Sequence, residues 1–178
     1  MNDFLNPFGF LPVNVYWHRF NDAAKIPSKR NEDAGFDIYT IEDDVLLMPH
    51  EKRLFSTGLG AAIDKGYWLM AFDRGSTGSR GIHTHCGVVD NGYRGEIFIC
   101  LCNDNDKLPI LFTSKATKIE EQTIAPYGKV LVYPTSKGIA QLIPMEQPRV
   151  ESKEASDELW KVLCNTERGD GKLGASGK

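Results

Sequence analysis

The stretch HTHCGVVDNGYRGEIFICLC, residues 83–102, decides how the rest of the chain folds. Its Asn-Gly pair at 91–92 tolerates positive φ, so it predicts the tip or corner of a β-hairpin. Two valines lead into this turn, and the apolar run at 97–99 leads out of it. Asp90 is then the last residue of a strand, where its carboxylate either bonds to the amides of the turn or serves a reaction.

Short runs in which apolar and polar residues alternate continue this pattern along the chain. Each run ends at Gly, Pro, Asn or Asp, which is typical of an antiparallel β-barrel or sandwich. The runs are VNVYWHRF (13–20), DIYTIEDDVLLM (37–48), KRLFSTGLGAAI (52–63), YWLMAF (67–72) and KVLVYP (129–134). Helical periodicity is weak, and only SKEASDELWKVL (152–163) predicts a short helix or an extended linker.

Two segments fall outside this pattern. Residues 103–136 are a polar excursion containing lysine and threonine, which predicts a long hairpin or a mobile loop. The last eleven residues, RGDGKLGASGK, hold four glycines and cannot build a core element, so a mobile C-terminal arm is expected. Such an arm is either a disordered terminus or a flap whose amides approach anions closely. We therefore expect a barrel domain at 1–150 and a linker with the arm at 151–178.

Length and composition limit the kind of protein. With 178 residues the chain suits one domain with a real core. A net charge of −3 argues against broad attachment to nucleic acid, which needs many basic residues. The sequence shows neither a membrane span nor a signal peptide, so a cytoplasmic setting is expected, or the host cytoplasm for a viral chain. Its four cysteines contain no Cys-x-x-Cys pair and are interpreted as reduced core thiols.

Five short stretches occur in a fixed order along the chain. They are DAGFDIY (33–39), DRGSTGSRG (73–81), GVVDNGYRGEI (87–97), GIAQLI (138–143) and RGDGKLGASG (168–177). Together they resemble the five motifs of the trimeric deoxyuridine triphosphatases, the dUTPases. The third motif is the most specific. The second is the least regular, because Asp73 stands in place of proline and Gly75 follows Arg74 where serine is usual, which shifts that role to Ser76.

This resemblance implies a small jelly-roll-like β-barrel that forms homotrimers, with active sites shared by three chains and closed by the C-terminal arm. It implies Mg²⁺-dependent hydrolysis of dUTP to dUMP and pyrophosphate. Asp90 corresponds to the catalytic base that orients and deprotonates the water attacking the α-phosphorus. Asp37 corresponds to the aspartate that reaches Mg²⁺ through its water shell, although a turn or interface salt bridge is the other interpretation of this residue.

The other residues implied by the resemblance bind substrate. Tyr93 packs under the deoxyribose and excludes a ribose 2′-hydroxyl, and backbone groups near 82–87 read uracil. Gln141 positions the water or a phosphate oxygen, or is an ordinary barrel residue with a satisfied amide. Arginines, Ser76 and loop amides hold the phosphates. The implied set is Arg74, Gly75, Ser76, Thr77, Gly87, Val88, Tyr93, Gln141, Arg168, Gly169, Leu173, Gly174 and Ser176.

Departures from the family pattern keep other functions open. Gly138 follows a lysine where Asp-Arg is usual, and Leu173 replaces the aromatic ring that stacks on uracil, so weaker substrate affinity is expected. One alternative is a dCTP deaminase of the same fold, with Glu96 as its acid and base. Another is a weakly catalytic, dUTPase-derived regulatory module, which would bind a partner protein through an insertion at 103–136 that is otherwise a plain surface hairpin.

Overall fold

The structure is a computed structural model that describes residues 12–85 and 87–166. It divides into two compact units, Met1–Gln147 and Pro148–Lys178. The described strands and the short helix α1 (Gly75–Gly78) belong to the first unit, and helix α2 (Asp157–Leu163) belongs to the second. Among the described residues, no helix has the length and apolar character that a membrane span requires.

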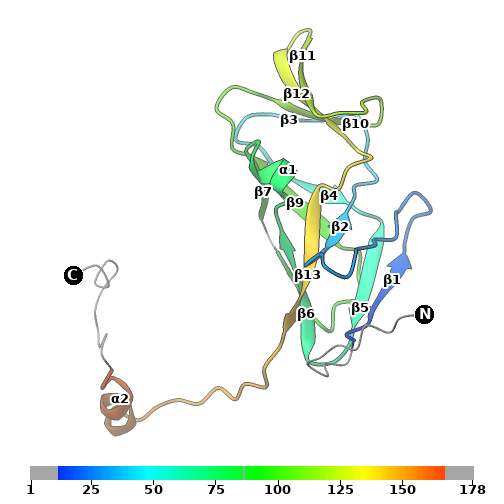
Figure 1. Ribbon diagram of the computed structural model, residues 1–178. Coiled ribbons are helices and arrows are strands. Elements are labelled where there is room, and N and C mark those ends of the chain that lie inside the picture. The colour runs from blue at the N-terminus through cyan, green and yellow to red at the C-terminus, as the bar shows by residue number, and fades with distance from the viewer. Residues whose placement is uncertain (1–11, 86, 167–178) are drawn as a thin grey trace. The chain divides into compact units, whose positions relative to one another are not determined.

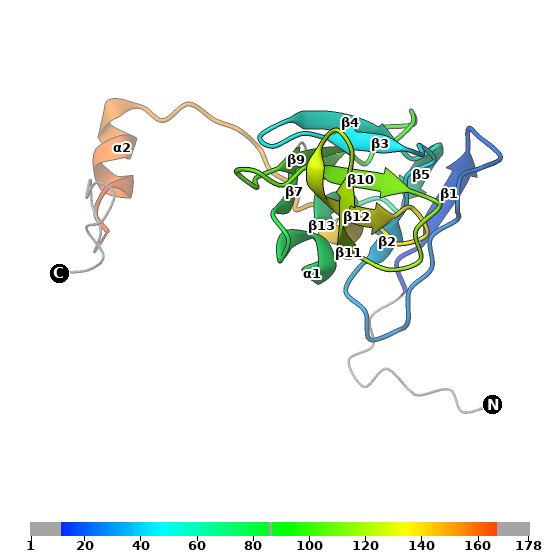
Figure 2. The ribbon, with the colours of Figure 1, turned by 90° about the horizontal axis from the view of Figure 1, so that it is seen from above.

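The first unit is built from short strands that form four sheets around a common interior (Figures 1 and 2). The strands are β1 (Val15–Arg19), β2 (Phe36–Ile38), β3 (Val45–Leu47), β4 (Lys52–Ser56), β5 (Leu59–Ile63), β6 (Tyr67–Phe72), β7 (Ile82–His85), β8 (Val88–Val89), β9 (Phe98–Asn103), β10 (Ile110–Thr113), β11 (Glu120–Ile124), β12 (Gly128–Pro134) and β13 (Ala140–Glu146). Their orders in the sheets are β1-β5, β11-β12-β10-β3, β2-β13-β6-β8 and β4-β9-β7. Paired strands are antiparallel except β10 and β12, which are parallel.

One apolar core lies between the four sheets. Phe112 has no exposed surface in this core, and its ring centroid lies 4.9 Å from that of Phe55 and 5.4 Å from that of Tyr133. Strand β6 alternates as its sequence predicts, burying Leu69 and Ala71, whereas the middle strand β9 is buried on both faces after its first residue. The predicted all-β, jelly-roll-like fold is confirmed, although the described strands do not close into a continuous barrel.

The Asn-Gly turn is a corner between two sheets and not the tip of a hairpin. Strand β8 pairs with β6, whereas β9 pairs with β4 and β7, so the hairpin prediction is wrong. Gly92 does not adopt positive φ. The turn is fixed instead by Asn91, whose Nδ2 donates to the carbonyl oxygens of Ile63, Asp64 and Tyr67 at 3.2, 3.0 and 2.7 Å. This side chain replaces the ladder bonds that a hairpin would have used.

Residues 103–136 differ from the expected long hairpin or mobile loop. Strands β11 and β12 do form a hairpin, seen at one end of the first unit in Figure 1. Strands β10 and β12, however, are core strands that bury apolar side chains, among them Ile110 and Val130 with no exposed surface. Strands β10 and β12 of this segment are therefore part of the core, whereas β11 is largely exposed.

Helix α2 forms in the stretch that predicts a short helix. Its N-cap is Ser156, whose hydroxyl accepts a hydrogen bond from the Leu159 amide at 3.3 Å, and acidic residues occupy its first turn. None of its residues is buried. Cys100 and Cys102 are buried as predicted, but Cys164, which was also predicted to be a core thiol, is exposed at the end of α2.

Candidate active site

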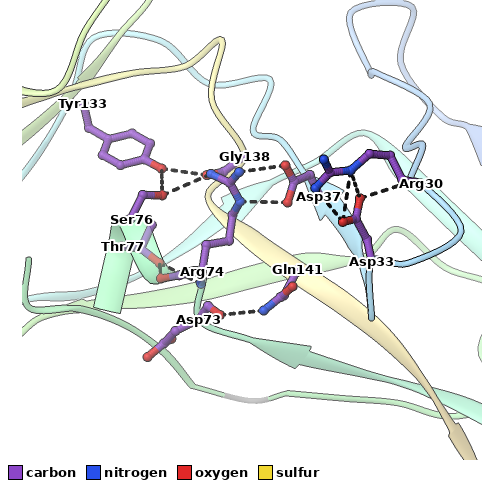
Figure 3. Close-up of polar contacts among 10 residues, drawn as sticks. All are labelled: Arg30, Asp33, Asp37, Asp73, Arg74, Ser76, Thr77, Tyr133, Gly138 and Gln141. Atoms are coloured by element: carbon purple, nitrogen blue, oxygen red, sulfur yellow. Dashed lines mark hydrogen bonds and ion pairs between the residues drawn. The ribbon is translucent and has the colours of Figure 1, made fainter. Parts of the chain in front are cut away.

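A cavity of about 510 Å³ gathers residues from the first, second and fourth motifs. Its walls are the loop at 28–35, the neighbouring antiparallel strands β2 and β13, and the start of α1. Asp37 and Gln141 are register partners across β2 and β13, which explains why two distant motifs meet here. The structure thus brings together five of the predicted residues, namely Asp37, Arg74, Gly75, Ser76 and Gln141. All of them except Gly75 are drawn in Figure 3.

Arg74 is held by a nearly complete set of protein contacts (Figure 3). Its Nε and Nη2 donate to the two carboxylate oxygens of Asp37, both at 2.7 Å, and Nη1 donates to Ser76 Oγ and Gly138 O at 3.1 and 3.0 Å. Four of the five guanidinium N–H groups are therefore engaged. Partial burial lowers the pKa of Arg74, because it disfavours the charged guanidinium. The hydrogen bonds and the charge of Asp37, together with Tyr133, outweigh this effect and raise the pKa. Asp37 thus forms an ion pair with Arg74 of the same chain, at the wall of the cavity.

Gly138 gives Arg74 both an acceptor and room. Its carbonyl oxygen accepts from Arg74 and, at 2.7 Å, from the hydroxyl of the buried Tyr133. A Cβ at position 138 would lie 3.2 Å from Arg74 Cδ and from Asp37 Cβ, which is tighter than ordinary contact. The glycine that departs from the family pattern is therefore compatible with the close packing of the Arg74–Asp37 pair.

Helix α1 shapes the loop that carries Arg74. Thr77, predicted to bind substrate, has no exposed surface, and its hydroxyl donates to the Arg74 carbonyl and accepts from the Arg74 amide, both at 3.0 Å. Thr77 thus fixes the backbone and is not presented to the cavity. Gly75 and Ser76 do line the cavity, and amides at the start of a helix have no partner within that helix.

Asp73, noted in the sequence only as a departure from proline, is the centre of a polar network. Its carboxylate accepts from the amide and hydroxyl of Thr84 at 2.6 and 2.8 Å and lies 2.7 Å from His83 Nδ1. Its backbone oxygen accepts from Gln141 Nε2 at 3.0 Å. Partial burial favours the neutral acid, but these bonds prevail and lower the pKa of Asp73. Asp73 thus joins the second motif to β7 and to β13.

This network predicts a pH-dependent loss of stability for Asp73→Asn. At about pH 7 the variant should lose roughly 1–2 kcal/mol of unfolding free energy, because a neutral amide cannot replace a carboxylate that accepts several bonds. The folded-state pKa lies below the unfolded value of about 3.9, so the stabilisation is complete above that value and is lost as pH falls through the folded pKa. Denaturant unfolding of both proteins at several pH values measures the difference, and a gap unchanged down to about pH 2 would contradict it.

A second cavity, of about 270 Å³, contains the third-motif residues. Asp90 directly follows β8, and only its backbone takes part in the turn, its carbonyl oxygen accepting from the Tyr93 amide at 3.0 Å. Among the described residues, its exposed carboxylate has no hydrogen-bond partner, so it does not cap the turn. The Tyr93 hydroxyl donates to the Glu96 carbonyl oxygen at 2.7 Å. A Cβ added at Gly95 would lie only 2.6 Å from this hydroxyl oxygen.

Glu96 and the apolar rim complete this second cavity. One carboxylate oxygen of Glu96 accepts from the Gly58 amide at 2.8 Å and from the Ser56 hydroxyl, so this acid fixes the β4–β5 connection. Leu54, Val88 and Phe98 line the same cavity and are 58%, 61% and 45% exposed. These three apolar side chains are exposed together around the carboxylate of Asp90.

Within one chain the predicted site residues form two separate groups. The two cavities share no lining residue. Asp37 lies on β2 and Asp90 follows β8, at opposite edges of the β2-β13-β6-β8 sheet. Three strand spacings separate those edges, which is roughly 14 Å. Within the described residues of a single chain, Asp90 therefore lies apart from the cavity at Arg74.

Gly87 has a structural role in the described chain. Gly87 pairs through its carbonyl oxygen with the Ala71 amide at 2.7 Å, and an added Cβ would lie 2.9 Å from Ala71 O, so this glycine allows close strand packing. The five arm residues lie outside the described part of the chain: Arg168, Gly169, Leu173, Gly174 and Ser176.

Comparison with known proteins places the chain among nucleotide hydrolases. The family model named dUTPase matches residues 21–115. Deoxyuridine 5′-triphosphate nucleotidohydrolase of Nautilia profundicola is 32% identical over 90% of this chain and 96% of its own length. The enzyme of the same name from Mycobacterium leprae (strain TN) is 33% identical over 89% and 92%.

Solved structures show the same fold. The dUTPase of Staphylococcus bacteriophage 80alpha with dUpNHpp has a TM-score of 0.69 at 24% identity, and the match covers 93% of this chain and 99% of that one. A variant dUTPase of phage phi11 of S. aureus, described with a structural Mg(II) ion, has a TM-score of 0.64 at 22% identity over 81% and 97%.

Proposed function

The chain belongs to the dUTPase family, and we propose from this that it hydrolyses dUTP to dUMP and pyrophosphate. The observation that carries the proposal is the carboxylate of Asp90, which has no partner among residues 12–85 and 87–166 and lines a cavity beside Tyr93, in the order of the third motif. The dCTP deaminase alternative is not favoured. Glu96, its candidate acid and base, uses a carboxylate oxygen to fix Ser56 and Gly58.

Asp90 acts as the general base in this reaction. It accepts a proton from a water molecule as the water oxygen bonds to the α-phosphorus. The bond between the α-phosphorus and the oxygen that bridges it to the β-phosphorus breaks in the same step. Asp90 then releases this proton to solvent. The products are dUMP, pyrophosphate and a proton, so atoms and charge balance without a covalent enzyme intermediate. Asn91 contributes by anchoring the loop through three bonds to the β5–β6 connection, which keeps the carboxylate at one place.

The phosphate chain is held by the cavity at Arg74. The amides of Gly75 and Ser76, the Ser76 hydroxyl and the remaining N–H of Arg74 supply the donors that a triphosphate needs. Arg74 also holds the cavity together, because its bonds to Asp37 and Gly138 join the second motif to the first and the fourth. The arm residues Arg168, Gly169, Leu173, Gly174 and Ser176 are proposed to close over the substrate.

Mg²⁺ is the proposed cofactor, and the residues at the Arg74 cavity fit it. Mg²⁺ keeps several waters and is usually bound by substrate phosphates and one or two carboxylates, so no dense cluster of protein ligands is needed. Asp37 faces the cavity, and each of its oxygens keeps a lone pair beyond its bond to Arg74, which suits contact through the metal's water shell. When bound, the ion neutralises phosphate charge.

The active enzyme is proposed to be a homotrimer with shared sites. Asp90 and Tyr93 lie in one cavity and Arg74 and Gln141 in another, so a complete site requires the two cavities of different chains to face each other. The exposed Leu54, Val88 and Phe98 around Asp90 suit burial against a second copy. Cyclic assembly with head-to-tail contacts gives every chain one of each half-site.

A nucleotide panel with identified products tests the proposed function. With Mg²⁺, the protein should release pyrophosphate and dUMP from dUTP, and much less product from UTP, because Tyr93 leaves no room for a 2′-hydroxyl. It should release no ammonia from dCTP. Ammonia release would instead identify a deaminase, and tight dUTP binding without pyrophosphate would identify a regulatory module. Either result would reject the proposal.

A further inference from the structure

Arg30 lines the same cavity as Arg74 but belongs to none of the five motifs. We propose that Arg30 is a further phosphate-binding residue of this site, held aside by Asp33 until a nucleotide enters. This inference rests on the proposed function and deepens it, since it assigns a role to the loop at 28–35 that forms one wall of the cavity.

The described lining of the cavity offers few cationic donors. Arg74 has a single N–H left after its bonds to Asp37, Ser76 and Gly138. The lining carboxylates are those of Glu32, Asp33 and Asp37, against two guanidinium groups. A triphosphate is strongly anionic, so a second guanidinium at this cavity that can turn toward it would strengthen its binding.

Arg30 meets this requirement. Its side chain is 83% exposed and pairs with Asp33, with Nη2 2.8 Å and Nε 3.2 Å from Asp33 Oδ1 (Figure 3). Within the described residues, Nη1 has no partner, so part of the guanidinium is already unused. Asp33 also accepts from the Arg30 amide at 3.0 Å, which fixes the backbone and leaves the side chain to rotate.

The exchange of partners is favoured by the exposure of the ion pair. Exposed pairs contribute little to stability, whereas phosphate oxygens accept two parallel N–H bonds from one guanidinium. Lys29 is held near Asp33 independently of Arg30's side chain, because its Nζ donates to the backbone carbonyl oxygens of Asp33 and Arg30 at 2.9 and 3.1 Å, and its charge acts on the Asp33 carboxylate. Asp33 therefore keeps a neighbouring cation after Arg30 has moved.

Binding of dUpNHpp and dUMP to variants of the full chain, measured calorimetrically with Mg²⁺, tests the proposal. Arg30→Gln should weaken dUpNHpp binding about ten-fold, as expected for the loss of a charged hydrogen bond, and change dUMP binding much less. Asp33→Asn frees Arg30 and should leave dUpNHpp binding unchanged or tighter. Lys118→Gln is the control, because it removes an exposed cation paired with Glu120 on the β11–β12 hairpin.

The two substitutions break the same ion pair but should differ in their effect on dUpNHpp affinity. This difference separates a phosphate contact by Arg30 from a structural role of the pair. If both weakened dUpNHpp binding equally, or if Arg30→Gln had the affinity of the wild type, the assignment would be wrong. An equal loss of dUMP affinity would also overturn it. Pyrophosphate release by the wild type is measured separately. A protein that binds dUpNHpp but does not hydrolyse dUTP would reject the proposed function and still show whether Arg30 contacts phosphate.

Discussion

Asp90→Asn is expected to lower kcat for dUTP about 10²- to 10⁴-fold and to leave nucleotide binding and the fold nearly unchanged. The carboxylate has no protein partner within the described residues, so its replacement removes a base and breaks no hydrogen bond in the chain. The amide cannot accept a proton from water at neutral pH. Pyrophosphate release under saturating dUTP measures the loss, and calorimetry with dUpNHpp measures the binding that should remain.

Asp106→Asn is a matched control for this substitution. Asp106 is also an exposed loop aspartate, with a side chain 89% exposed and 3.4 Å from His50 Nε2, and it lines neither cavity. The control should keep wild-type kcat and thermal stability. If Asp90→Asn lowered thermal stability but kept turnover, Asp90 would be a structural residue of the turn and the proposed mechanism would be wrong.

Local alternation predicted most strands because it depends on neighbours in sequence. YWLMAF became β6 without change. The run at 37–48 instead splits into β2 and β3, because the Thr40 hydroxyl donates to the Ser56 carbonyl and accepts from the Glu42 amide, both at 3.0 Å. Side-chain bonds of this kind interrupt a strand and leave no trace in hydrophobic periodicity.

The motifs predicted which residues gather but not how they bond. Asp37 and Arg74 are 37 residues apart, and no pattern in the sequence reveals that they form a bidentate pair. The same holds for the contact of Gly138 with Arg74, 64 residues away, which depends on the absence of a side chain. The separation of Asp90 from Arg74 likewise follows from strand order in the sheet, which one sequence does not specify.

Asp90→Asn and Arg74→Ala are each expected to be nearly inactive alone and to recover activity together. In a cyclic trimer whose sites combine Asp90 of one chain with the Arg74 cavity of the next, any trimer containing both variants has one undamaged site. Co-expression with two different tags and purification through both should therefore give about one third of wild-type activity. If each site lay within one chain, every site would carry a defect and nothing would be recovered.

A pair of variants in the same half-site is the control for this complementation. Asp90 and Tyr93 line one cavity, so Asp90→Asn and Tyr93→Ala damage the same half of each shared site, and mixed trimers should show no more activity than the average of the two variants measured alone. Arg74→Ala leaves Asp37, about one third exposed, without its ion-pair partner, and thermal unfolding establishes that this variant is folded before mixing. Recovery in the first pair alone requires Asp90 and Arg74 to act from different chains. Equal recovery in both pairs, or in neither, would contradict the shared site.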